Sequence, residues 1–72
     1  MKNLKGYTKL TPREAEVMSY VVKGYSNQQI ADEMFITKHT VKAHISSAFS
    51  KLHVKNRWDA AMTILNIKTS NT

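Results

Sequence analysis

The segment from Met34 to Trp58 contains no acidic residue and five basic ones, a combination suited to binding a polyanion. The five are Lys38, Lys42, Lys51, Lys55 and Arg57. Four acidic residues precede this segment and only Asp59 follows it, so the formal net charge of +6 is unevenly distributed. A one-sided positive field attracts nucleic acid, an anionic membrane surface or an acidic protein. The sequence therefore predicts a polyanionic partner for the middle of the chain.

Three histidines in the same segment raise the question of a metal site. His39, His44 and His53 fall on different sides of a helix at their spacings, and the chain has no cysteine to complete a ligand set. We therefore expect no metal and no other cofactor. The sequence also shows no nucleophile with a base, no phosphate-binding loop and no carboxylate pair, so we expect no enzymatic activity.

Four helix-start signals predict the elements that position these groups. Each begins with a Ser, Thr or Asn N-cap, and the first two have a Glu or Gln three residues later that completes a capping box. The caps are Thr11, Ser26, Thr37 and Asn56. Apolar residues at helical spacing follow. The first, second and fourth predicted helices cover residues 12–23, residues 27 to about 34, and residues 57 to about 67. The third begins after residue 37 and is about four turns long. Gly24 suits the left-handed position that ends the first of them.

The third predicted helix has two clearly different faces. Its apolar stripe consists of Val41, Ile45, Ala48 and Leu52, with Phe49 beside it. Its opposite face is small or polar and carries no acid: His39, Lys42, Ala43, Ser46 and Ser50. About three residues, 35–37, separate it from the second helix, which is the connection length of a helix-turn-helix. Ala31 is small where the two helices must approach each other.

From about Leu10 to Ile67, the chain resembles the LuxR/GerE-type DNA-binding domains. The matching strings are Leu10-Thr11-Pro12-Arg13-Glu14, Gly24-Tyr25-Ser26-Asn27-Gln28-Gln29-Ile30-Ala31, Ile36-Thr37, Thr40-Val41-Lys42-Ala43-His44-Ile45-Ser46 and Lys51-Leu52-His53-Val54-Lys55-Asn56-Arg57. The resemblance implies an all-α fold, a four-helix LuxR/GerE-type helix-turn-helix domain. It also implies a bacterial transcriptional regulator that binds specific sequences of double-stranded DNA with its third helix in the major groove, usually as a dimer.

The resemblance also implies residue roles. Base contacts fall to Lys42, Ala43 and Ser46. Phosphate contacts fall to hydroxyl and amide groups at helix N-termini and to three further cations: Ser26, Asn27, Thr37, Thr40, Lys38, Lys55 and Arg57. The family usually has Gly where this chain has His53, so we expect the left-handed turn there to be strained by about 1 kcal/mol or to be recast.

The fourth predicted helix is apolar on two sides, although packing within one domain needs only one. One side consists of Ala60, Ile64 and Ile67, and the other of Trp58, Ala61, Met62 and Leu65. The family dimerises through this helix, so we expect a homodimer interface at Trp58, Ala61, Met62 and Leu65. We expect Trp58 to pack in the core or at this interface rather than to stack on a base.

For the whole chain we expect a flexible N-terminal segment (1–9), the helix-turn-helix domain (10–67) and a polar tail (68–72). No apolar run approaches the roughly 20 residues of a membrane span, so we expect a cytoplasmic, nucleoid-associated protein without a membrane partner. RNA polymerase is a further candidate partner. The chain is either a complete small regulator or the output domain of a receiver or autoinducer-sensing protein. The alternative function is a sigma-factor region-four-like module that docks on polymerase.

Overall fold

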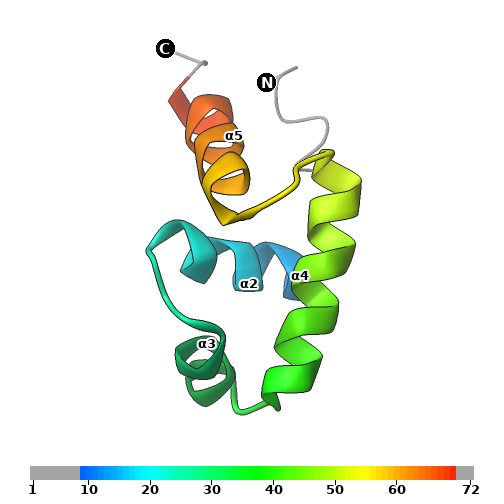
Figure 1. Cartoon of the computed structure of the whole chain (residues 1–72), viewed down its shortest axis with the longest axis vertical. Helices are drawn as coiled ribbons and strands as arrows, with labels where there is room; N and C mark the ends of the chain where they lie inside the picture. Colours follow the sequence, from blue (N-terminus) through cyan, green and yellow to red (C-terminus); the bar gives the residue numbers. More distant parts are fainter. Residues whose placement is uncertain (1–8, 70–72) are drawn as a thin grey trace.

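The computed structural model describes the backbone of residues 9–69 and the side chains of residues 9–65, where all regular elements are helices (Figure 1). They are α2 (Pro12–Val22), α3 (Asn27–Met34), α4 (Lys38–Leu52) and α5 (Arg57–Thr69). In Figure 1, α2 lies in the middle with α3 and α5 on either side of it, and α4 runs along the three. The all-α, four-helix prediction is confirmed. No described helix has the length and hydrophobicity needed to cross a bilayer.

Two predicted helix ends are wrong by one or two residues. The first helix ends at Val22 rather than Lys23, because Lys23 is the C-cap whose N–H still bonds to the Val21 carbonyl. The last helix reaches Thr69, two residues past the approximate predicted end near Ile67. The first residues of the predicted polar tail are therefore helical. The predicted flexible segment, except Lys9, and residues 70–72 lie outside the described residues.

All four predicted N-caps form. Thr11 and Glu14 make both bonds of a capping box, and so do Ser26 and Gln29. The Thr37 hydroxyl accepts the N–H of Thr40 at 3.0 Å. The Asn56 side-chain oxygen accepts the N–H of Asp59 at 2.9 Å. Each bond satisfies a backbone donor that a helix start leaves unpaired.

The helices α2, α3 and α4 all end in the same way, with one residue in the left-handed region. These residues are Gly24 (φ 89°), Phe35 (φ 57°) and His53 (φ 58°). The next residue then donates its N–H five residues back, which gives Tyr25 to Tyr20, Ile36 to Ala31 and Val54 to Phe49. The left-handed role of Gly24 is confirmed, and His53 keeps the left-handed turn rather than recasting it. Phe35 was not anticipated in this role.

The core consists of the apolar stripes predicted for the helices. The predicted stripe of α4, Val41, Ile45, Ala48 and Leu52, is buried throughout. The other helices contribute Val17, Met18, Val21, Ile30, Ala31, Met34, Ala60 and Ile64. Tyr25, Ile36 and Val54, which follow the three left-handed residues, pack against this core. Each helix end therefore directs an apolar side chain inward and fixes the path to the next helix.

Candidate nucleic-acid interface

The outward face of α4 is exposed along the helix, as the sequence predicted. It consists of His39, Lys42, Ala43, Ser46 and Ser50. The opposite side of the same helix is the buried stripe described above. Because packing fixes α4 along its inner side, the outer side chains project from a rigid support. The three predicted base-contacting residues, Lys42, Ala43 and Ser46, all lie on this face.

The helix α3 braces α4 through a connection of three residues, Phe35–Thr37, as predicted. Within it the N–H of Ile36 bonds to the carbonyl of Ala31 at 3.1 Å, and the Ile36 side chain packs against the core. Ala31 is only 3% exposed, consistent with the close approach predicted for it. This is the arrangement of a helix-turn-helix, with the second helix held so that its outer face is free.

The hydroxyl groups predicted to meet phosphate lie at the first turns of α3 and α4. The Ser26 oxygen accepts the N–H of Gln29 at 3.1 Å. The hydroxyl oxygens of Thr37 and Thr40 are 2.9 Å apart, and Thr37 also caps α4. Ser26 and Thr37 are exposed, while Thr40 is half-buried. The two helix starts therefore present backbone N–H groups beside exposed hydroxyls, a setting that favours anions.

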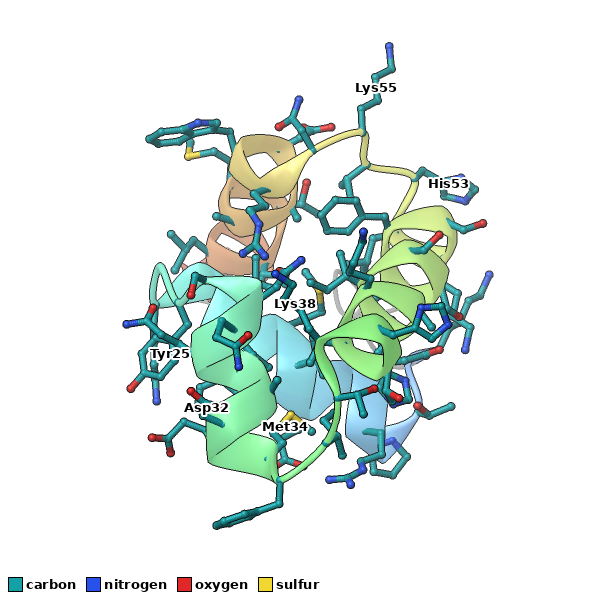
Figure 2. The ribbon with its side chains drawn as sticks, turned by 60° about the horizontal axis from the view of Figure 1, so that its bottom comes forward. Tyr25, Asp32, Met34, Lys38, His53 and Lys55 are labelled. Atoms are coloured by element: carbon teal, nitrogen blue, oxygen red, sulfur yellow. The ribbon has the colours of Figure 1, made fainter. Side chains whose placement is uncertain are left out.

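A groove of about 770 Å³ connects the start of α3 with α4 and α5. Its walls include Asn27 from α3, Lys38 and Lys42 from α4, and Arg57 and Trp58 from α5. Figure 2 shows Lys38 in the space between these helices. A smaller depression beside it is lined by Asn27, Lys42, Ser46 and Arg57, among others. None of the described residues that line either depression is acidic. The fold thus gathers three cations on one acid-free surface.

Arg57, which the sequence assigned to phosphate, makes two hydrogen bonds inside the domain. Its Nη1 donates to the carbonyl oxygen of Tyr25 at 3.0 Å, and its Nη2 donates to the side-chain oxygen of Asn27. The side chain is half-buried. Two predicted phosphate contacts, Asn27 and Arg57, are therefore bonded to each other.

Lys55 lies apart from the groove. It is exposed on the connection between α4 and α5, and its side chain points away from the domain together with that of His53 (Figure 2). Its backbone N–H bonds to the carboxylate of Asp59 at 3.3 Å. Of the predicted cations, the structure thus brings Lys38, Lys42 and Arg57 together and leaves Lys55 separate.

The fifth cation of the acid-free segment, Lys51, faces inward and pairs with Glu14. The carboxylate of Glu14 accepts Lys51 Nζ at 2.7 Å, the Ser47 hydroxyl at 2.6 Å and the Thr11 N–H at 2.9 Å. Glu14 is 5% exposed. These bonds, that from Lys51 first and then that from Ser47, lower the pKa of Glu14 to about 2. Glu14 therefore joins the start of α2 to the second half of α4.

Two of these features were not predicted from the sequence. The capping box of Glu14 was predicted, but its bonds to Ser47 and Lys51, which are 33 and 37 residues away, were not. Phe35, which is left-handed and 94% exposed, was not predicted either. The one available signal was position: Phe35 stands directly before Ile36 at the end of α3, as Gly24 stands before Tyr25 at the end of α2.

The two apolar sides of α5 have different surroundings. Ala60 and Ile64 are buried in the core, whereas Trp58, Met62 and Leu65 are exposed by 84%, 57% and 43%. Ala61 is half-buried. The alternative that Trp58 packs in the core is therefore wrong, because the indole lies on the outer side of the helix. The predicted interface residues form one exposed side, while Ile67 lies outside the described side chains.

The fold and this surface define a helix-turn-helix DNA-binding domain. Within the described part of the chain, no group of three or more potential ligands is placed to hold a metal ion. Residues 8–64 match the family model of bacterial regulatory proteins of the luxR family. The chain belongs to this luxR family, as its resemblance to LuxR/GerE-type domains predicted.

The relatives it resembles include three staphylococcal proteins, each named response regulator protein VraR. They come from Staphylococcus aureus (strain Mu3 / ATCC 700698), Staphylococcus saprophyticus and Staphylococcus epidermidis. Each is 48% identical to this chain over 56 residues, which is 78% of the chain. The chain spans 27% of the length of these relatives.

Proposed function

We propose that this domain is a sequence-specific, double-stranded DNA-binding transcriptional regulator that places α4 in the major groove. The observation that carries the proposal is the outer face of α4, which is exposed, free of acid and continuous with a groove bordered by Lys38, Lys42 and Arg57. A major groove about 12 Å wide admits a helix of this kind when a second helix supports it from behind. The helix α3 supplies that support.

The proposed contacts divide between bases and phosphates. Lys42, Ala43 and Ser46 face the bases, with the Lys42 ammonium suited to the O6 and N7 acceptors of guanine. The phosphate contacts come from the starts of α3 and α4 and from three cations. The residues at the helix starts are Ser26, Asn27, Thr37 and Thr40, and the cations are Lys38, Lys55 and Arg57. Ser26 and Thr37, which cap α3 and α4, would then also help to fix the register of the domain on DNA.

We further propose that two copies associate through the exposed side of α5. Trp58 and Met62 are large apolar side chains on a helix that already buries its other side in the core. Apolar side chains exposed together on one helix are typical of a protein interface. A symmetric pair through Trp58, Ala61, Met62 and Leu65 would present two copies of α4 to neighbouring half-sites.

The proposal also places the domain in the bacterial cytoplasm, at the nucleoid, with RNA polymerase as a further partner. The relatives of this chain are named response regulators, and the chain spans 27% of their length. A longer regulator in which this domain is the output part and a small regulator built from this domain alone both fit the proposed DNA contacts.

The decisive experiment is a DNA titration at several salt concentrations, with a site selected from random DNA. Phosphate contact predicts that log K falls by about 0.9 per neutralised phosphate for each unit of log salt. Lys42→Ala should weaken binding to the selected site by about 1 to 3 kcal/mol and relax the preference at one base pair. Lys23→Ala removes the same charge at an exposed position that does not line the groove, and should leave that preference intact.

Two results would contradict these contacts. A binding constant that does not change with salt would exclude the phosphate contacts. A Lys42→Ala loss that is equal on every DNA sequence would place Lys42 on a phosphate rather than a base.

Light scattering without DNA tests the pairing through α5. The wild type should be a dimer, and Met62→Lys should shift it toward monomer. A wild-type chain that stays monomeric well above micromolar concentration would contradict the dimer.

A further inference from the structure

The guanidinium of Arg57 connects the first turn of α5 with the start of α3. It donates to the carbonyl of Tyr25 in the α2–α3 connection and to the side chain of Asn27 in the first turn of α3. These partners are 32 and 30 residues away in sequence. Both bonds link α5 to the start of the helix-turn-helix.

Both acceptors are neutral, so this contact does not cancel the charge of Arg57. The planar fork of an arginine fixes the direction of two N–H groups at once. A lysine would bring the same charge but not the same geometry. The shape of the guanidinium, rather than its charge, is therefore what fixes the geometry of this contact.

The position of the contact matters for the proposed dimer. Arg57 and Asn27 line the same depression as Lys42 and Ser46 of the proposed base-reading face. Arg57 also lines the larger groove beside Trp58 and Ala61 of the proposed dimer side. The contact thus lies between the surface that would hold the second copy and the surface that would hold DNA.

We propose that Arg57 is a positioning residue that makes α5 and the helix-turn-helix one rigid unit and thereby sets the half-site spacing. This inference rests on the proposed dimer through α5. The connection 53–56 and the packing of Ala60 and Ile64 in the core also hold α5. In a symmetric pair, any change in the angle between α5 and α4 changes the separation of the two reading helices on both sides of the axis.

The test measures affinity for DNA duplexes that carry two selected half-sites, with the spacing varied one base pair at a time. Arg57→Lys keeps the charge and removes the fork, and Asn27→Ala removes an acceptor without changing any charge. Both should reduce the preference for the best spacing over its neighbours about tenfold. Arg57→Lys should do so with a nearly unchanged salt dependence. Lys23→Gln is the control: it removes an exposed charge outside both depressions and should keep the spacing preference.

Circular dichroism at the assay temperature establishes whether each variant is folded. If Arg57→Lys does not fold, Asn27→Ala provides the test. If the wild type prefers one spacing and a folded Arg57→Lys or Asn27→Ala variant keeps that preference, the inference is overturned while the proposed dimer stands. If the wild type shows no spacing preference at all, the dimer of the proposed function fails first and the inference fails with it.

Discussion

The two ends of α4 are held in different ways. At the C-terminal end, Ser47 and Lys51 bond to the buried carboxylate of Glu14 on α2. At the N-terminal end, Lys38 and Lys42 are exposed beside the groove, and the nearby bond of Arg57 to Asn27 joins α5 to α3 rather than to α4. One end of the helix is thus anchored by charge, whereas the other keeps its charge facing outward.

This difference changes the interpretation of the acid-free segment. The sequence places five cations there, but Lys51 is neutralised inside the domain by Glu14. The outward positive charge of the segment therefore comes from the other four, of which Lys38, Lys42 and Arg57 border one groove. An ion pair at one end fixes the helix, and uncompensated cations at the other end remain available to a polyanion.

The largest expected effect is loss of the charged anchor. Glu14→Gln keeps the side-chain shape but removes the charge that Lys51 and Ser47 bond to, and should lower the free energy of unfolding by about 2 kcal/mol. Chemical denaturation measures this. Glu16→Gln is the matched control, since its ion pair with Arg13 is exposed at 3.5 Å and should contribute less than about 0.5 kcal/mol. Equal effects of the two substitutions would contradict the anchor.

The anchor should also make stability depend on pH. The pKa of Glu14 is lowered in the folded state to about 2 from an ordinary value of 4.5, so the unfolded chain binds the proton more tightly. The contribution of Glu14 is therefore fully present above about pH 5 and is lost as pH falls toward 2, at no more than about 1.4 kcal/mol per pH unit. Denaturation of the wild type and Glu14→Gln across this range should give a difference that shrinks with acid. A constant difference would contradict the lowered pKa.

A smaller effect is expected for the bond of Arg57 to Asn27, which lies near the N-terminal end of α4. Asn27→Ala removes one acceptor of Arg57, and should lower the free energy of unfolding by about 1 kcal/mol because hydrogen bonds to charged groups contribute modestly when partly exposed. Because Asn27 is a neutral acceptor, this loss should not show the dependence on acid that is expected for Glu14→Gln. A loss in Asn27→Ala as large as that in Glu14→Gln would remove the contrast between the two ends.

Effects of about this size or smaller concern the left-handed residues that follow α2, α3 and α4. Phe35→Gly and His53→Gly should each raise the free energy of unfolding by about 0.5 to 1 kcal/mol, because both side chains are exposed and glycine removes the left-handed strain. Gly24→Ala should lower it by about 1 kcal/mol at φ 89°. Thermal unfolding of the three variants measures this. A destabilising Phe35→Gly would mean that the phenyl ring contributes contacts to the folded state.

Much of the fold could be predicted because its signals are local. A cap such as Thr37 and the Thr40 N–H that it accepts lie within three residues, and the stripe from Val41 to Leu52 repeats every three or four residues, so both are visible in the sequence. The exposed face of α4 follows directly from that stripe. The residues that end the helices were less visible: glycine marks the turn after α2, but nothing in the side chain of Phe35 marks the turn after α3.

The sequence by itself determined four capped helices, the side of α4 that faces outward and the excess of positive charge in the middle of the chain. Only the tertiary structure decided that Lys51 pairs with Glu14, that Arg57 bonds to Asn27 and that the Trp58 side of α5 lies outside the core. The physical reason is range. Helix caps and periodicity depend on neighbours within about four residues, whereas these pairs join residues 30 or more positions apart and form only after the helices have packed.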